Sequence, residues 1–329
     1  MKMNERDYQL FAALAQQTQE TLLESLPRLM HKYYKQDKCF EHPEFLLYKG
    51  NCPILLVSHL DTVFSAPPKD IFFDAQKQVL WSPQGLGADD RAGIFSIIKI
   101  LQRGYRPSIL FTTEEEVGGL GALEAVTIFS NAPVDVKYCI ELDRRGAKDC
   151  VFYQCDNPEF EEYVESFGFV TNYGTFTDIS TICPEWGIAG VNLSVGYLNE
   201  HTYSELLYIK HTYATIEKVC KMLDDADNAK QFKYIPQLVN PYLTAMFKDR
   251  LSAAKRPQYK EYTCYKCGKT YSEDDVFPVK CTDPVKGMHY YCIDCVGEGV
   301  NWCAVCGEPF ETKNPNNAVC EDCLNGDRM

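Results

Sequence analysis

Five short motifs rich in acidic residues and histidine follow one another in the first two thirds of the chain. They span residues 58–63 (SHLDTV), 85–93 (GLGADDRAG), 113–119 (TEEEVGG), 141–143 (ELD) and 199–205 (NEHTYSE). A neutral imidazole such as that of His59 binds zinc well, and its second ring nitrogen needs a hydrogen-bond acceptor. In extended backbone, residues two apart face the same side, so Asp61 can supply this acceptor. Each motif alone fits a solvated turn or a helix cap, so only their combination indicates a metal site.

Taken together, the motifs resemble those of the co-catalytic two-zinc exopeptidases, which include zinc aminopeptidases, tripeptidase T-like enzymes, zinc carboxypeptidases of the glutamate type and aminoacylases. The patterns H-x-D-T-V, G-A-D-D-R-A-G, E-E-V-G, L-D and a late histidine occur here in the family's order, over residues 50–225. The resemblance implies that Asp89 bridges two metal ions. His59 and Asp143 would complete one site, and Glu116 and His201 the other.

The same resemblance implies the catalytic residues. Glu115 would be the general base that takes a proton from water held by the metals, and Asp61 would orient a ligand histidine. It also implies a cis peptide bond between Asp89 and Asp90. The donors suit two catalytic zinc ions, with manganese or cobalt as possible substitutes. Residues 173–178 resemble a G-T-D loop of the family, so Thr177 and Asp178 are predicted to bind a substrate amine, although a simple turn explains them equally well.

The spacing of the motifs leaves no room for an additional lid domain. The bridging Asp89 follows His59 by 30 residues, and His201 follows Asp143 by 58 residues. Many members of the family carry a lid or dimerisation domain in one of these intervals. We therefore expect the bare catalytic core, similar to single-domain zinc aminopeptidases.

The elements that must position these motifs alternate between strands and helices. Apolar runs predict a hairpin at residues 71–81 and strands at 53–58, 108–113, 134–142, 150–154 and 188–195. Helical periodicity predicts an N-terminal helical segment at 1–37 and helices at 92–101, 119–130, 157–167 and about 203–223. This order indicates an α/β fold with a mainly parallel central sheet flanked by helices. The metal-binding motifs follow the predicted strands, at the carboxyl ends where such sheets bind ligands.

The last 70 residues differ in composition and predict a second metal-binding unit. Nine of the 16 cysteines lie there, mostly in C-x-x-C pairs, which in a chain without an export signal indicate zinc rather than disulfides. The simplest assignment is two structural zinc ions held by eight thiolates. Cys264, Cys267, Cys292 and Cys295 would form one site, and Cys303, Cys306, Cys320 and Cys323 the other, as in a zinc ribbon. A RING-like arrangement that uses Cys281 and His289 is the alternative.

Composition limits the class of protein and its partners. The 329 residues carry a net charge of −13, and the tail from residue 257 has twelve acidic against seven basic residues, so nucleic-acid binding is disfavoured. No apolar stretch is long enough to cross a membrane, and the charged N-terminus is unlike a signal peptide, which predicts a cytoplasmic protein. The expected domains are a peptidase domain (1–225), a partly helical linker (226–258) and a Cys-rich zinc domain (259–329).

These observations favour a zinc-dependent exo-acting metallopeptidase, most simply an aminopeptidase, with a peptide substrate. A deacylase acting on N-acyl amino acids would use the same metal ligands, and only the substrate pocket would distinguish it. A protein of another class, in which a RING-like tail recruits a protein partner and the peptidase core serves as a scaffold, is the third alternative. The intact Glu115 and the complete set of five ligands argue against that last possibility.

Overall fold

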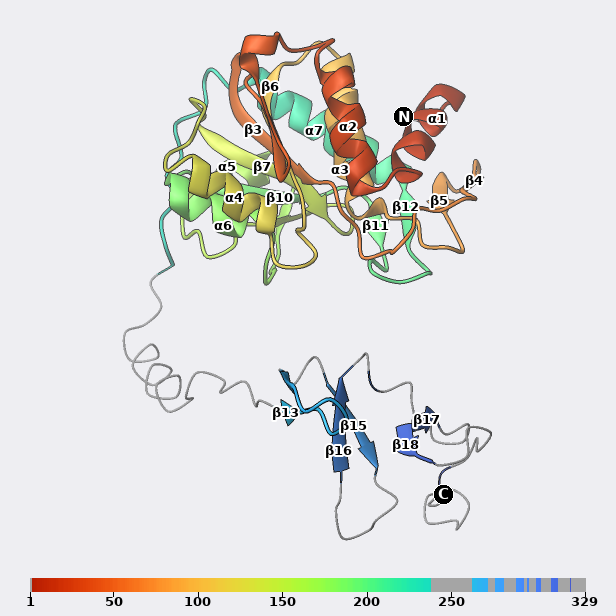
Figure 1. The fold of residues 1–329 in the computed structure, drawn as a ribbon. Coiled ribbons are helices and arrows are strands. Elements are labelled where there is room, and N and C mark those ends of the chain that lie inside the picture. The colour runs from red at the N-terminus through yellow and green to blue at the C-terminus, as the bar shows by residue number, and fades with distance from the viewer. Residues whose placement is uncertain are drawn as a thin grey trace. The chain divides into compact units, whose positions relative to one another are not determined.

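A computed structural model describes residues 2–237 without a gap, and the ranges 262–271, 276–280, 288–292, 300–302 and 309–312 with Cys295 and Cys320. The chain divides into two compact units, Met1–Leu238 and Val239–Met329, which are considered separately (Figure 1). In the described part of the chain, none of the helices has the length and apolarity needed to cross a membrane.

The first unit is built on a mixed, mainly parallel sheet of eight strands. In spatial order these are β1 (Cys39–His42), β2 (Phe45–Tyr48), β6 (Pro107–Thr112), β3 (Cys52–His59), β7 (Tyr138–Arg144), β10 (Gly190–Ser194), β8 (Asp149–Val151) and β9 (Val170–Thr171). The four central strands β6, β3, β7 and β10 are parallel to one another. Their carboxyl ends therefore meet at one edge, which carries the motifs at residues 59 and 143.

Helices cover both faces of this sheet. They are α1 (Glu5–Ala15), α2 (Gln19–Met30), the short 3-10 helix η1 (Gln36–Lys38), α3 (Ala88–Gln102), α4 (Leu120–Ile128), α5 (Pro158–Ser166), α6 (Asp178–Trp186) and α7 (Ile209–Asp224). Buried side chains of α1, α2, α3, α5 and α7 share one hydrophobic cluster, whereas those of α4 and α6 share the other. The predicted fold class, an α/β sheet flanked by helices, is confirmed.

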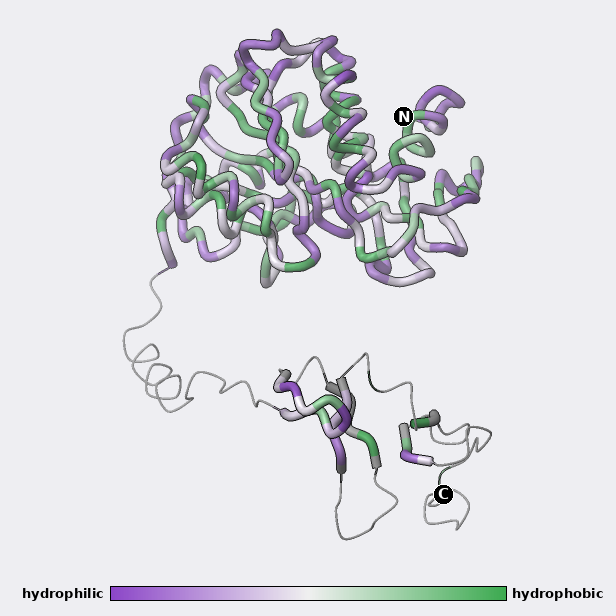
Figure 2. Tube along the Cα trace, in the orientation of Figure 1, coloured by the Kyte–Doolittle hydropathy of each residue, from purple (hydrophilic) through white to green (hydrophobic). Residues whose placement is uncertain are grey.

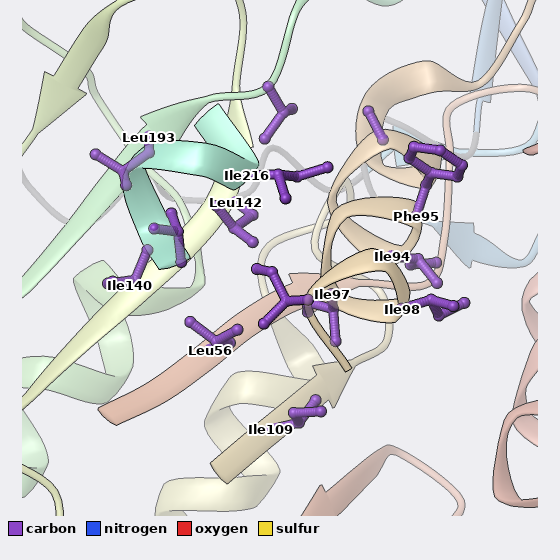
Figure 3. Close-up of a cluster of buried hydrophobic side chains, with 14 of the residues drawn as sticks. Leu56, Ile94, Phe95, Ile97, Ile98, Ile109, Ile140, Leu142, Leu193 and Ile216 are labelled. Atoms are coloured by element: carbon purple, nitrogen blue, oxygen red, sulfur yellow. The ribbon is translucent and has the colours of Figure 1, made fainter. Parts of the chain in front are cut away.

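Alternation along the strands explains why two cores form. In β3, Leu56 faces the first cluster whereas Leu55 and Val57 face the second, as expected for a strand buried on both faces. Figure 3 shows Leu56 with side chains of α3 and α7, among them Ile97 and Ile216. Figure 2 shows the hydrophobic colour along the central strands and hydrophilic colour on most outer loops.

A smaller antiparallel sheet lies beside the site. Its order is β11 (Tyr197–Leu198), β12 (Leu206–Tyr208), β5 (Val79–Trp81) and β4 (Phe72–Asp74). Strands β4 and β5 form the hairpin predicted at residues 71–81. The helix predicted from about residue 203 instead begins at Ile209, because residues 206–208 pair with β11 and β5 as a strand. Helix α6 begins where the predicted loop 173–178 ends and continues through residues for which the sequence predicted no element.

The second unit contains short strands in the residues that the structure describes. Strands β13 (Tyr262–Thr263) and β14 (Thr270–Tyr271) pair as a hairpin around the first C-x-x-C motif. A four-stranded sheet has the order β16 (Met288–Cys292), β15 (Val276–Lys280), β18 (Pro309–Glu311) and β17 (Val300–Trp302). Its small apolar cluster consists of Val279, Tyr291 and Val300, with Cys295 packed against it.

Candidate active site

His59 lies at the carboxyl end of β3, fully buried, and Asp61 holds its ring. The imidazole Nδ1 is 3.1 Å from Asp61 Oδ1, so its other nitrogen, Nε2, points into the site. The two oxygens of Asp61 also accept the backbone N–H groups of Glu115 and Glu116, each at 3.0 Å. One carboxylate thus fixes both the histidine and the backbone that carries the two glutamates.

Asp89 lies between the two histidines. Its Oδ1 is 3.1 Å from His59 Nε2, and its Oδ2 is 3.2 Å from His201 Nε2. Burial by itself would raise the pKa of Asp89, but the hydrogen bonds to His201 and His59 lower the pKa below its usual value. The two oxygens of this carboxylate face different imidazoles. A ligand shared by two metal ions would have the same position.

The backbone behind Asp89 is closely packed. The Asp89–Asp90 peptide bond is cis, as the family resemblance implied. The buried Asp90 carboxylate accepts hydrogen bonds from the Ser58 hydroxyl at 2.5 Å and from the Gly93 N–H at 2.8 Å. A Cβ at Gly93 would lie 2.2 Å from the backbone oxygen of Leu142, so only glycine allows α3 to approach β7 this closely.

Asp143 is held by hydrogen bonds to three residues. Its Oδ2 accepts the Thr177 hydroxyl at 3.1 Å, and its Oδ1 accepts the Tyr197 hydroxyl at 3.1 Å. Asn192 accepts the Asp143 backbone N–H at 3.0 Å and donates its amide to the Asp143 backbone oxygen at 3.2 Å. The same Oδ1 lies 3.5 Å from His59 Nε2, which brings Asp143 to the His59 side of the site.

Glu116 and His201 meet on the opposite side of Asp89. His201 Nε2 lies 3.0 Å from Glu116 Oε2, while the buried Glu116 Oε1 has no hydrogen-bond partner among the described residues. The hydrogen bond to Asp89, with the nearby Glu116, raises the pKa of His201 to about 9. Burial, followed by the charge of Asp89, raises the pKa of Glu116 to about 7.

Glu115 lies next to His59 and Glu116 in the cluster. One carboxylate oxygen lies within 4.8 Å of a nitrogen of His59 and an oxygen of Glu116. Burial raises the pKa of Glu115 to about 9, and the carboxylates of Asp143 and Asp178 add to the increase. A carboxyl group with a raised pKa beside the ligand cluster is suited to accepting and returning a proton.

The charges and donors of this cluster fit metal ions. Asp89, Glu115, Glu116 and Asp143 converge at one place, and in the described part of the chain only imidazoles lie within ion-pair distance of these carboxylates. An imidazole must be neutral to act as a ligand, so it would leave the carboxylates without a compensating charge. Divalent cations would supply that charge, and the unpartnered Oε1 of Glu116 is a donor atom available to them.

Glu205 is a residue of the site that the sequence did not single out. Its carboxylate is buried and accepts the backbone N–H groups of Ala88 and Asp89, each at 3.1 Å. It therefore holds the peptide that carries the Asp89 carboxylate. Glu205 lies inside the fifth motif. The sequence predicted a helix from about residue 203, and a helical Glu205 would point its side chain in another direction than the observed one.

Thr177 and Asp178, predicted to contact a substrate amine, lie next to Asp143. Thr177 caps α6 and its hydroxyl is bonded to Asp143. Asp178 is fully buried and accepts a hydrogen bond from the Thr112 hydroxyl. Their contact with a substrate stays a prediction.

In the second unit, three of the predicted zinc ligands come together. The Sγ atoms of Cys264, Cys267 and Cys295 lie within 4.8 Å of one another. Cys292 ends β16, and Cys320 is buried. His289, the ligand of the RING-like alternative, has its Nδ1 2.7 Å from Glu311 Oε1. The other predicted ligands, Cys281, Cys303, Cys306 and Cys323, lie outside the described residues.

Known structures share the fold of this chain. Aminopeptidase PepT from Bacillus cereus is 16% identical, with a TM-score of 0.51 over 69% of this chain and 99% of its own. A tripeptidase from Staphylococcus aureus is 15% identical, with a TM-score of 0.53 over 70% and 100%. An aminopeptidase from the archaeon Desulfurococcus kamchatkensis is 14% identical, with a TM-score of 0.50 over 69% and 96%. No family model and no curated protein matches the chain. The chain therefore has the fold of these peptidases, with a buried His/Asp/Glu cluster able to bind metal.

Proposed function

We propose that this protein is a zinc-dependent aminopeptidase. The observation that carries the proposal is the position of Asp89, whose two oxygens face His59 and His201 on a fold shared with aminopeptidases. His59, Asp89 and Asp143 would hold one catalytic zinc, and Asp89, Glu116 and His201 the other. When bound, the metal ions supply Lewis-acid activation of water and of the scissile carbonyl. Manganese or cobalt would suit the same donors.

The protein's own residues then have separate tasks. Glu115 accepts the proton of the attacking water and returns it to the leaving amine. Asp61 keeps His59 in the tautomer that presents Nε2 and fixes the backbone of Glu115 through a hydrogen bond of 3.0 Å. Thr177, with Asp178 beside it, would line the approach of the substrate amine near Asp143.

The Cys-rich unit would hold structural zinc. Cys264, Cys267 and Cys295 would bind one ion together with Cys292, and Cys303, Cys306, Cys320 and Cys323 a second. The convergence of the first three thiols supports the first of these sites. About four zinc ions per chain are expected by elemental analysis, and two would refute one of the assignments.

Substrate cleavage by the metal-loaded protein tests the proposed function. Amino-acid anilides and dipeptides should be hydrolysed, and N-acetyl amino acids should not. Glu115→Gln should lower kcat by roughly 10²–10⁴-fold with the metal content unchanged, because only the proton acceptor is lost. Glu124→Gln, on the half-exposed surface of α4, is the matched control and should retain activity. Full activity of Glu115→Gln contradicts the mechanism, and cleavage of only the N-acetyl substrates would establish a deacylase instead.

A further inference from the structure

A cavity of about 450 Å³ opens directly beside the metal-binding cluster. Its lining includes Asp61 and Glu116 on the side of the cluster. The opposite wall comes from the turn between α1 and α2, with Gln17 and Gln19. A cavity of this size holds one long side chain. In this lidless core, the N-terminal helices thus form one wall of the space next to the reacting centre.

Glu114 is a carboxylate of this cavity that the metal site does not use. Its backbone is left-handed, with φ at +54°, a conformation that is unusual for a residue other than glycine. Gln19 fixes it through two hydrogen bonds: the Gln19 amide donates to Glu114 Oε1 at 2.6 Å, and Gln19 Oε1 accepts the Glu114 N–H at 3.1 Å. Helix α2 therefore holds Glu114 in place at the cavity.

The lining favours a cation at the end of an apolar stem. Glu20 and Glu114 line the cavity and are free of the metal cluster, while Val63 and Val117 provide apolar wall. Among the lining residues the only lysine or arginine is Arg91. Its guanidinium is buried and donates to backbone oxygens of residues 17, 60 and 61, so it is already bound. Lysine and arginine side chains combine an apolar stem with a charged end, which is the chemistry this lining matches.

We propose that this cavity binds the side chain of the substrate's N-terminal residue and selects lysine or arginine, with Glu114 recognising the positive charge. The inference rests on the proposed aminopeptidase activity and adds its substrate class. Carboxylate-to-cation hydrogen bonds are among the stronger polar contacts, so a preference of about tenfold or more is expected.

A pair of matched substrates tests the selection. Lysyl and norleucyl anilides have stems of the same length, and only lysine carries the charge. The full-length, metal-loaded protein should show kcat/KM about tenfold or more higher for the lysyl substrate. Glu114→Gln keeps an acceptor for Gln19 and removes the charge, so the lysyl-to-norleucyl ratio should fall by about tenfold. Glu24→Gln, exposed on the same helix α2, should leave the ratio unchanged.

Inhibition by amino-acid amides and a second variant provide two further tests of the proposed selection. Lysine amide should inhibit more strongly than norleucine amide, and Glu114→Lys should shift preference toward a glutamyl anilide. Hydrolysis of both anilides at equal kcat/KM, or an unchanged ratio in Glu114→Gln, overturns the selection but leaves the aminopeptidase activity standing. No hydrolysis of any anilide overturns both.

Discussion

Replacing Glu205 by alanine tests whether its carboxylate holds Asp89 in place. The side chain is 1% exposed, and its two oxygens accept the N–H groups of Ala88 and Asp89. The substitution would leave both donors buried next to the carboxylate that faces the two histidines. We expect a loss of stability and a looser metal site, because the orientation of Asp89 depends on this peptide.

The size of the effect follows from the two hydrogen bonds. Each bond to a charged acceptor is worth about 1.5–3 kcal/mol, so their removal should lower the free energy of unfolding by about 3 kcal/mol or more. Glu205→Gln keeps one accepting oxygen, now uncharged, and turns an amide donor toward the other N–H group, so its loss should be nearly as large as that of the alanine variant. Compared with a total stability of about 5–15 kcal/mol, the alanine variant is measurably weakened but still folded.

Urea denaturation followed by far-UV circular dichroism measures this difference, and chelator competition measures the metal affinity of the same samples. Glu159→Gln serves as the control. Its carboxylate pairs with Lys230 on the surface, where both side chains are about 70% exposed, and should contribute about 0.5 kcal/mol or less. If Glu205→Ala lost no more stability than this control and bound metal as tightly as the wild type, the role assigned to Glu205 would be refuted.

Three further predictions concern the same centre. Asp61→Asn should weaken catalytic-site zinc binding by about 10–100-fold in chelator competition, because the amide fixes the His59 tautomer poorly; unchanged affinity would contradict this. Gly93→Ala should lower the free energy of unfolding by about 1–3 kcal/mol, since its Cβ would meet the Leu142 oxygen at 2.2 Å; a neutral effect in urea titrations would exclude that packing argument. Zinc binding should weaken as the pH falls from 9 to 7, because protons compete with the metal for His201 and Glu116. Calorimetry in buffers of different ionisation enthalpy should detect proton release on zinc binding at pH 7. His201→Ala should reduce this release.

The sequence predicted which side chains come together where a motif follows a buried strand. His59 directly ends β3, and Asp143 lies near the end of β7, so the parallel sheet brings them together. The predicted cis bond at Asp89–Asp90 is confirmed. The first two positions depend on strand ends, which can be recognised in the sequence, whereas the cis bond was implied only by the family resemblance.

Contacts between distant segments were not predictable in the same way. Glu205 reaches Ala88 across 117 positions, and Gln19 reaches Glu114 across 95. Both are polar residues in segments that local periodicity describes as helical or as surface, so nothing in their neighbourhood indicates the partner. The strand at residues 206–208 was missed because its register is set by pairing with β11 and β5.

The order of the ligands along the chain has a consequence for biosynthesis. His59 and Asp89 are made early, but His201 comes much later, and the β12 strand that follows it must pair with β5 before its loop is fixed. A ribosome-bound chain that ends before residue 201 lacks His201 and holds only part of the cluster. Complete metal binding by the cluster is therefore expected only late in synthesis, once His201 has left the ribosome and β12 has paired with β5.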